Sequence, residues 1–178
     1  MRNALHFLLT VGLFAWDGTL LAVAQPPECR SILPAVVEQQ LQTSYKGWTV
    51  LTFDDLLQDD QELWRKAHGS ECPGVFAGHF VDNKNMDYAV LVIKNDAGEK
   101  EVKLLVISAL NISELYTERH VSNYPVIHKG GPGKYGDVYN PSKSVTAETD
   151  VPIYEHIEAS AIAFIYKNGK YHRILISD

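Results

Sequence analysis

A run of polar side chains at residues 78–90, GHFVDNKNMDYAV, contains residue types that could bind a metal ion. Calcium takes about six to eight oxygen ligands, which a tight loop supplies from alternate side chains and a backbone carbonyl. The alternate positions of this run are His79, Val81, Asn83, Asn85 and Asp87, and the last three carry a side-chain oxygen. One carboxylate and two amides predict poor calcium binding, because affinity follows the number and charge of the ligands.

The same run resembles the calcium loops of FG-GAP repeats, the blades of integrin-type propellers, whose pattern is close to G-D-F-N-G-D-G-x-x-D-L-A-V. The framework positions that match without gaps are Gly78, Phe80, Asp87, Ala89 and Val90. Lys84 replaces the glycine of the sharp turn, and Asp82 is out of phase with the ligand positions. The resemblance therefore implies a strand–turn–strand unit that has lost its metal.

A broader resemblance covers most of the chain after residue 25. Residues 47–94 and the ending IEASAIAFIYKNGKYHRILISD are similar to a group of small exported bacterial proteins with an FG-GAP-like core, mostly of unknown function. Members often have a fuller loop of the type GDFDGDGKPDYAVLLI and an aromatic ending. Here Ile165, Tyr166 and Leu175 stand where that ending has tryptophans. The resemblance implies an α+β domain and brings no catalytic residue with it.

The other chemistry-bearing residues form no known catalytic motif. The histidines show no H-E-x-x-H spacing, and no G-x-S-x-G nucleophile elbow is present. The remaining catalytic hypothesis is an envelope hydrolase in which the fold brings His79 next to Asp82 or Asp87. A concave pocket holding these side chains would favour that hypothesis, and a filled hairpin end would count against it.

A Gly/Pro-rich stretch at residues 129–143 contains GGPGK, which superficially resembles a phosphate-binding loop. A Walker loop requires Ser or Thr after the lysine, whereas a tyrosine follows it here. Exposed loops of this composition often carry recognition, so the stretch predicts a surface binding loop. Its candidate contact residues are Tyr124, Lys134, Tyr135 and Tyr139. The alternative is that these tyrosines only pack the loop.

The apolar periodicity predicts the elements that position these residues. A helical stripe runs through residues 31–45, and a second helix, capped by Asp59 or Asp60, ends at Gly69. Residues 48–53, between the two helices, have strand propensity. After the second helix, strand-like runs occupy residues 74–80, 87–94, 101–110, 151–157, 159–167 and 171–178, while residues 111–120 fit a helix or a strand. NDAGE and Asn168-Gly169 predict hairpins. We therefore expect an α+β fold, with N-terminal helices followed by an antiparallel β-sheet of about five to seven strands with FG-GAP-like hairpins.

Residues 1–24 have the organisation of a secretory signal peptide, with an apolar run at 5–16 and Ala-Val-Ala before the cleavage point. The alternative is an uncleaved membrane anchor. It is disfavoured because Asp17 interrupts the apolar run well short of the roughly 20 residues that span a membrane. We therefore expect a periplasmic or secreted chain, with one α+β domain at residues 25–178 and no membrane span after cleavage.

The only two cysteines, Cys29 and Cys72, both lie after the predicted signal peptide. In an oxidising compartment, an even number of cysteines in a small domain predicts a disulfide. Closing a loop of this length contributes about 3–4 kcal/mol in the chain-entropy model. The competing interpretation is a reactive thiol, which would need a base that neither cysteine has nearby in the sequence.

Composition and charge narrow the class of function. The chain has 46% hydrophobic and 21% charged residues and a net charge of −6. An acidic chain without clustered Lys and Arg argues against a nucleic-acid partner and against an anionic membrane surface. The sequence predicts an exported, non-catalytic binding or interaction domain without a cofactor, which recognises a protein or an envelope component in an inhibitor-like or immunity-like way. The alternatives are the envelope hydrolase and a structural module stabilised by calcium.

Overall fold

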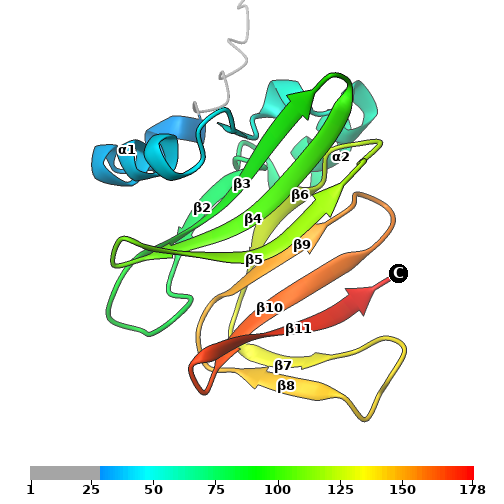
Figure 1. Cartoon of the computed structure of the whole chain (residues 1–178). Coiled ribbons are helices and arrows are strands. Elements are labelled where there is room, and N and C mark those ends of the chain that lie inside the picture. Colours follow the sequence, from blue (N-terminus) through cyan, green and yellow to red (C-terminus); the bar gives the residue numbers. More distant parts are fainter. Residues whose placement is uncertain (1–28) are drawn as a thin grey trace, which may run out of the picture.

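The computed structural model describes residues 29–178, which form a β-rich molecule with two helices in its N-terminal part (Figure 1). The helical elements are η1 (Cys29–Ile32), α1 (Ala35–Ser44), η2 (Phe53–Asp55) and α2 (Gln58–His68). The strands are β1 (Thr49–Val50), β2 (Val75–Gly78), β3 (Asp87–Asp96), β4 (Glu99–Ser108), β5 (Asn111–Arg119), β6 (Val126–Gly130), β7 (Gly133–Gly136), β8 (Ser144–Ala147), β9 (Val151–Glu155), β10 (Ala161–Lys167) and β11 (Lys170–Ser177). The predicted signal peptide, residues 1–24, lies outside the described residues.

The order of helices first and antiparallel strands afterwards confirms the predicted α+β class. Residues 29–178 contain eleven strands in three sheets, whereas about five to seven strands in one sheet were expected. The strands that were not expected are short, since β6 has five residues and β7 and β8 have four each. The strand propensity of residues 48–53 corresponds to the two-residue strand β1. Segments of this length are too short for an apolar alternation to be visible in the sequence.

The strand β3 is central in the first sheet. One edge of β3 pairs with β4, which pairs with β5 in turn. The other edge is shared, because β1 pairs with its C-terminal half and β2 with its N-terminal half. In this register Gly78 lies opposite Asp87, so residues 79–86 connect β2 to β3 at one end of the sheet.

The second sheet has the strand order β11-β10-β9-β6 and packs against the first sheet across the main apolar core. Leu91 of β3, Leu104 of β4 and Phe164 of β10 are buried in this core. Successive residues of a strand point to opposite faces, so Val90 and Val92 enter the separate apolar cluster under α1. Both faces of β3 are therefore buried, which explains why its sequence is apolar throughout.

Two predicted turns have different outcomes. The hairpin of β10 and β11 is confirmed, and Asn168 and Gly169 have φ of 53° and 80°, as a tight turn of this kind requires. Residues 129–143, expected to be a loop, instead include the end of β6 and all of β7, which pairs with the following strand β8 in a separate two-stranded sheet. The turn between these strands is organised by Asp137, whose carboxylate accepts a hydrogen bond from the ammonium group of Lys143 at 2.9 Å.

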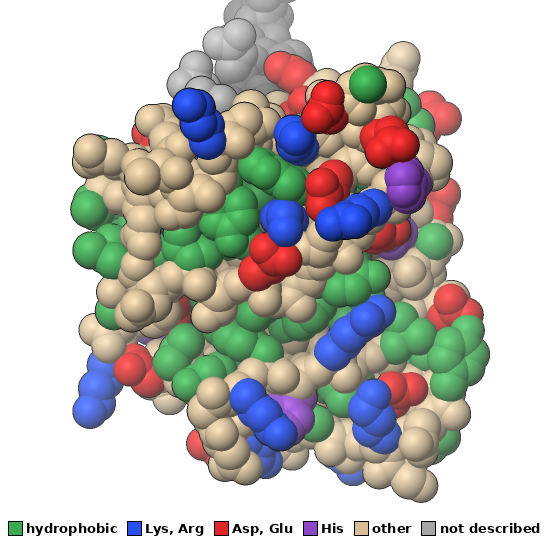
Figure 2. Space-filling view, in the orientation of Figure 1, with side chains coloured by type: hydrophobic (Ala, Val, Ile, Leu, Met, Phe, Trp, Pro, Cys, Tyr) green, Lys and Arg blue, Asp and Glu red, His purple; other side chains and the backbone are tan. Residues whose placement is uncertain are grey.

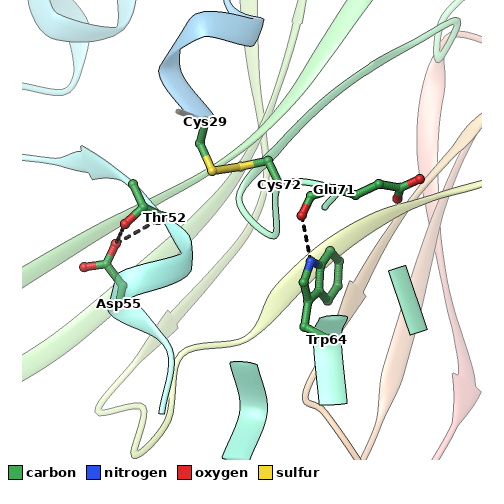
Figure 3. Close-up of a disulfide and its surroundings, with 6 residues drawn as sticks. All are labelled: Cys29, Thr52, Asp55, Trp64, Glu71 and Cys72. Carbon is green, nitrogen blue, oxygen red and sulfur yellow. Dashed lines mark hydrogen bonds between the residues drawn. A yellow bond between two sulfur atoms is a disulfide. The ribbon is translucent and has the colours of Figure 1, made fainter. Parts of the chain in front are cut away.

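The predicted disulfide between Cys29 and Cys72 is present, with the two Cα atoms 5.5 Å apart (Figure 3). It joins η1 to the segment that connects α2 to β2. Val37 of α1 is buried beside it, but Val36, which the helical stripe also included, is 53% exposed. The buried face of α1 is smaller than the predicted stripe, because residues 29–32 form a separate 3-10 turn and α1 begins only after Pro34.

The second helix, α2, begins two or three residues earlier than expected and ends at Gly69 as predicted. Its N-cap position is Leu57, so neither Asp59 nor Asp60 caps the helix. Both aspartates lie in the first turn, where the positive end of the helix dipole stabilises a carboxylate. These carboxylates are therefore displayed along the side of the helix.

The surface of the described residues carries mixed charge. Figure 2 shows Lys and Arg side chains interspersed with Asp and Glu on the face in view, with apolar side chains visible between them. None of the helices in residues 29–178 is long and apolar enough to cross a membrane.

Candidate functional site

The polar run singled out by the sequence is closed by Asp87, whose side chain is fully buried. Its Oδ2 accepts hydrogen bonds from the backbone N–H groups of Phe80 and Val81, at 2.8 and 2.9 Å. Its Oδ1 has no hydrogen-bond partner within residues 29–178. A buried carboxylate that satisfies two backbone donors has a structural task, which is to fix the path of the chain between β2 and β3.

The neighbouring polar side chains also bind the loop to itself. Asp82 Oδ1 accepts hydrogen bonds from the backbone N–H groups of Asn85 and Lys84, at 2.9 and 2.8 Å, and these bonds lower the pKa of the Asp82 carboxyl. His79 Nδ1 lies 2.7 Å from the backbone carbonyl oxygen of Asn85, so this nitrogen carries the proton and donates it. The side chains that looked reactive in sequence are thus engaged in local hydrogen bonds.

A second set of contacts ties this loop to the turn between β8 and β9. Asp150 Oδ2 accepts the backbone N–H of His79 at 3.0 Å, and the backbone N–H of Asp150 donates to the His79 carbonyl at 2.9 Å. The hydroxyl of Thr149 donates to the Phe80 carbonyl at 3.2 Å. The loop is therefore bonded both to itself and to the turn between β8 and β9.

The predicted ligands are placed differently from one another. Asp87 is buried, whereas Asn83 and Asn85 are exposed on the loop. Within residues 29–178, no three His, Cys, Asp or Glu side chains are arranged to hold a metal ion. The hydrolase candidates are His79, Asp82 and Asp87, and each already has the backbone partner described above.

The four residues of the predicted binding loop do not form one surface. Tyr124, which precedes β6, packs against the main core with the Lys100 ammonium 4.8 Å above its ring. Tyr135 of β7 is half-buried, and its hydroxyl donates to the Gly131 carbonyl at 2.6 Å. Lys134 is exposed, and Tyr139 in the turn after β7 is 70% exposed. Two of the three tyrosines are thus engaged in packing.

A hollow of about 480 Å³ lies beside α2, where the helix faces the end of β9 and the turn that follows it. We call it the α2 hollow; it is lined by Leu63, Trp64, Lys66, Ala67, His68, Glu155, Ile157 and Glu158. Trp64 is its most deeply buried wall, with 2% of its surface exposed. The indole N–H of Trp64 donates to the Glu71 carbonyl at 2.8 Å, which fixes the ring (Figure 3). The α2 hollow therefore combines a rigid apolar wall with charged residues at its edge.

A line of aromatic rings connects the α2 hollow to the edge strand β6. The ring of His68 stacks on Trp64, with centroids 4.0 Å apart and an interplanar angle of 24°. His128 of β6 follows, with its ring centroid 5.0 Å from that of His68. The Nε2 of His128 lies 3.1 Å from Oε2 of Glu155. These contacts attach the C-terminal end of α2 to the second sheet.

The environment of this line shifts the pKa of two of its members. Burial lowers the pKa of His68, and the neighbouring His128 lowers it further, while Glu71 and Glu155 oppose the shift. The hydrogen bond from His128 lowers the pKa of Glu155, against the opposing effect of burial. At neutral pH we therefore expect an uncharged His68 on Trp64 and an ionised Glu155 beside His128.

No family model, no curated protein and no solved structure matches this chain. The resemblance to FG-GAP repeats therefore stays a prediction.

Reasoning from the sequence did not find the α2 hollow, because its walls come from segments that are distant in sequence. Leu63 and Ala67 lie on α2, whereas Glu155 and Ile157 come from β9 and the turn after it. The available signal was short: Leu63 is four residues before Ala67, so both share one face of an otherwise polar helix, next to the buried Trp64.

Proposed function

We propose that this chain is an exported, non-catalytic binding domain that recognises a protein or an envelope component through the α2 hollow. The observation that carries the proposal is the hollow itself, because it is large enough for an apolar side chain of a partner. Interfaces commonly have a buried apolar centre and a polar rim. In the α2 hollow, the apolar centre consists of Leu63, Ala67 and Ile157. The polar rim consists of Lys66 and Glu158.

The rigid surroundings of the α2 hollow support a binding role. Trp64 is held by its hydrogen bond to Glu71, and His68 is held between Trp64 and His128. Preorganised walls reduce the entropy that a partner must lose on binding. The hollow can therefore contribute more to affinity than a mobile loop of the same composition.

Export is supported by two features of different origin. The first is the predicted signal peptide at residues 1–24, and the second is the disulfide between Cys29 and Cys72. Disulfides persist in oxidising compartments such as the periplasm or the exterior of the cell. Mass spectrometry of the protein from its own cells should find Gln25 at the N-terminus, and an intact Met1 or Arg2 would contradict export with cleavage.

A hydrolase that uses His79 with Asp82 or Asp87 has less support. Each of these side chains holds the β2–β3 connection closed through a hydrogen bond to the backbone. In the α2 hollow, none of the lining side chains carries a hydroxyl or a thiol that could act as a nucleophile. Binding at the α2 hollow is therefore better supported than hydrolysis at either region.

The experiment that tests the proposal is photo-crosslinking from single positions in the full chain. A photoreactive amino acid replaces Ala67, which is exposed and lines the α2 hollow. The matched controls place the same amino acid at Asn83 in the β2–β3 loop and at Thr146 on β8, both exposed.

We expect one discrete adduct from position 67 in the cells that produce the protein and none of that mass from positions 83 and 146. Equal adducts from all three positions would show that contact is not specific to the α2 hollow. The absence of any adduct at position 67 would contradict the proposal.

A further inference from the structure

The interior of the α2 hollow is apolar, but one side of its edge is acidic. Asp59 and Asp60 lie four and three residues before Leu63, so they share its side of α2 one turn nearer to the N-terminus. Glu158, in the turn after β9, lines the hollow from the other side. Three carboxylates from two segments thus border one end of the same apolar surface.

These carboxylates are crowded and lack cationic partners. Asp59 and Glu158 are exposed, and Asp60 is half-buried. None of the ion pairs formed within residues 29–178 includes any of the three. Burial first, and then the charges of Asp59 and Glu158, raise the pKa of Asp60. Like charges held this close repel one another, and an added cation would relieve the repulsion.

The cations near the α2 hollow do not neutralise this edge. Lys66 lies almost two helical turns after Asp59, towards the C-terminal end of α2. Arg65 points elsewhere, because its guanidinium carbon lies 4.0 Å from the ring centroid of Phe53. Glu155 is already paired with His128. The uncompensated negative charge is therefore concentrated at the end of the hollow bordered by Asp59, Asp60 and Glu158.

We infer that the α2 hollow binds a basic segment of a partner protein, with an apolar side chain in the hollow and neighbouring Lys or Arg side chains on Asp59, Asp60 and Glu158. This inference rests on the proposed binding function and adds the chemistry of the partner. Charge complementarity selects a cationic segment over a neutral or acidic one. Exposed ion pairs contribute little binding free energy in water, so burial of the apolar side chain supplies most of it.

The inference is tested with three short peptides that differ only in charge or in the apolar side chain. The probe is fluorescently labelled Lys-Lys-Phe-Lys-Lys, and the controls are Glu-Glu-Phe-Glu-Glu and Lys-Lys-Gly-Lys-Lys. Fluorescence anisotropy with the full mature chain should show the tightest binding for the probe. Binding should weaken as salt rises from about 20 mM to about 300 mM, because exposed charges are screened.

Two pairs of variants locate the binding. Replacing two acidic residues of the edge, Asp60→Asn with Glu158→Gln, should weaken binding of the probe by about fivefold to tenfold. The matched control removes two charges elsewhere, Glu38→Gln on α1 with Glu148→Gln in the turn between β8 and β9. At the same salt concentration, the affinity of the control variant for the probe should stay within about twofold of that of the unmodified chain.

The second pair fills space. Ala67→Trp should fill the α2 hollow and weaken binding of the probe. The affinity for Lys-Lys-Gly-Lys-Lys, which has no apolar side chain to place in the hollow, should not change. Ala35→Trp, on the exposed first residue of α1, adds the same side chain outside the hollow and should change neither peptide. Circular dichroism and the melting temperature confirm that each variant is folded before its affinity is compared.

Several outcomes would overturn the inference. Equal affinity for the Phe and Gly peptides would mean that charge acts without the hollow, and tighter binding of the Glu peptide would mean that the partner is not basic. Concentration-dependent dimerisation that blocks the probe would identify a second copy of this chain as the occupant. Each of these results leaves the crosslink from position 67 intact, so failure of the inference is distinguishable from failure of the proposed function.

Discussion

The loop between β2 and β3 and the α2 hollow both contain clustered carboxylates, but they use them in opposite ways. In the loop, Asp87 and Asp82 accept hydrogen bonds from backbone N–H groups of their own segment. Beside α2, Asp59 and Asp60 face another carboxylate, Glu158, and no cation within residues 29–178. The first arrangement engages its carboxylates in hydrogen bonds within the turn, whereas the second has no ion-pair partner within residues 29–178, and we propose that a basic segment of a partner supplies one.

The difference teaches that density of polar residues in sequence is a poor guide to a binding site. Alternating oxygens made residues 78–90 look like a metal loop, yet His79, Asp82 and Asp87 each bind a backbone group of the turn. Asp59 and Asp60 looked like ordinary helix-capping residues. Their partner in the site, Glu158, is about a hundred residues away, so only the fold brings the group together.

The largest effect on stability is expected from removal of the Cys29–Cys72 disulfide, whose Cys72 lies close to the α2 hollow in the chain. Cys72 follows Glu71, whose carbonyl holds the Trp64 ring (Figure 3). The double replacement Cys29→Ser with Cys72→Ser should lower the free energy of unfolding by about 4 kcal/mol, because 43 residues separate the cysteines. Urea denaturation measures the loss. A decrease below about 1 kcal/mol would mean that the bond restricts the unfolded chain little.

The stability of the protein should depend to a similar degree on one side chain of the loop between β2 and β3, that of Asp87. Asp87→Ala leaves the backbone N–H groups of Phe80 and Val81 without their acceptor, and we expect a loss of about 3 kcal/mol in urea denaturation. Asp87→Asn keeps one acceptor oxygen and should cost less. Asp82→Ala, in the exposed turn, should cost least of the three. If Asp82→Ala destabilises the protein as much as Asp87→Ala, the structural role assigned to the buried carboxylate is wrong.

A smaller effect is expected from pH at the α2 hollow. The pKa of His68 is lower in the folded protein than in the unfolded chain, so below about pH 6.5 the unfolded state binds more protons. Stability is therefore fully present above that pH and decreases as the pH falls through the folded pKa. Glu155, whose pKa is also lowered, adds a second decrease below about pH 4.5.

The pH effect has a matched pair of variants. His68→Gln should flatten the dependence of the urea midpoint on pH between about pH 7 and pH 5, because the buried imidazole is removed. His120→Gln removes a histidine whose side chain is 69% exposed and should leave the dependence unchanged. Identical curves for the two variants would contradict the assignment of the effect to His68.

The smallest effect is expected from calcium at the loop. The only ligand candidate with a full charge, Asp87, already binds two backbone N–H groups through Oδ2. Millimolar calcium should therefore raise the melting temperature no more than the same concentration of magnesium. A selective increase with calcium that disappears in Asp87→Asn would restore the hypothesis of a calcium-stabilised module.

The sequence predicted the elements with long or regular patterns. The apolar run of β3, the Asn168-Gly169 hairpin, the helix that ends at Gly69 and the disulfide all follow from local chemistry. The strands β7 and β8 were missed because each has only four residues, and the glycine and lysine of β7 carry no strand signal. The α2 hollow was missed because it needs β9 and α2 side by side, and single-sequence periodicity contains no information on which elements meet.

The central claim is that the α2 hollow binds a partner while the loop between β2 and β3 does not. The most direct measurement is a nitrogen-15 NMR titration of the mature chain with Lys-Lys-Phe-Lys-Lys, followed at every backbone amide. Our account predicts saturable shifts confined to residues 58–68 and 155–158, with residues 79–87 unchanged. Shifts centred on residues 79–87, or spread evenly over the acidic surface, would contradict it.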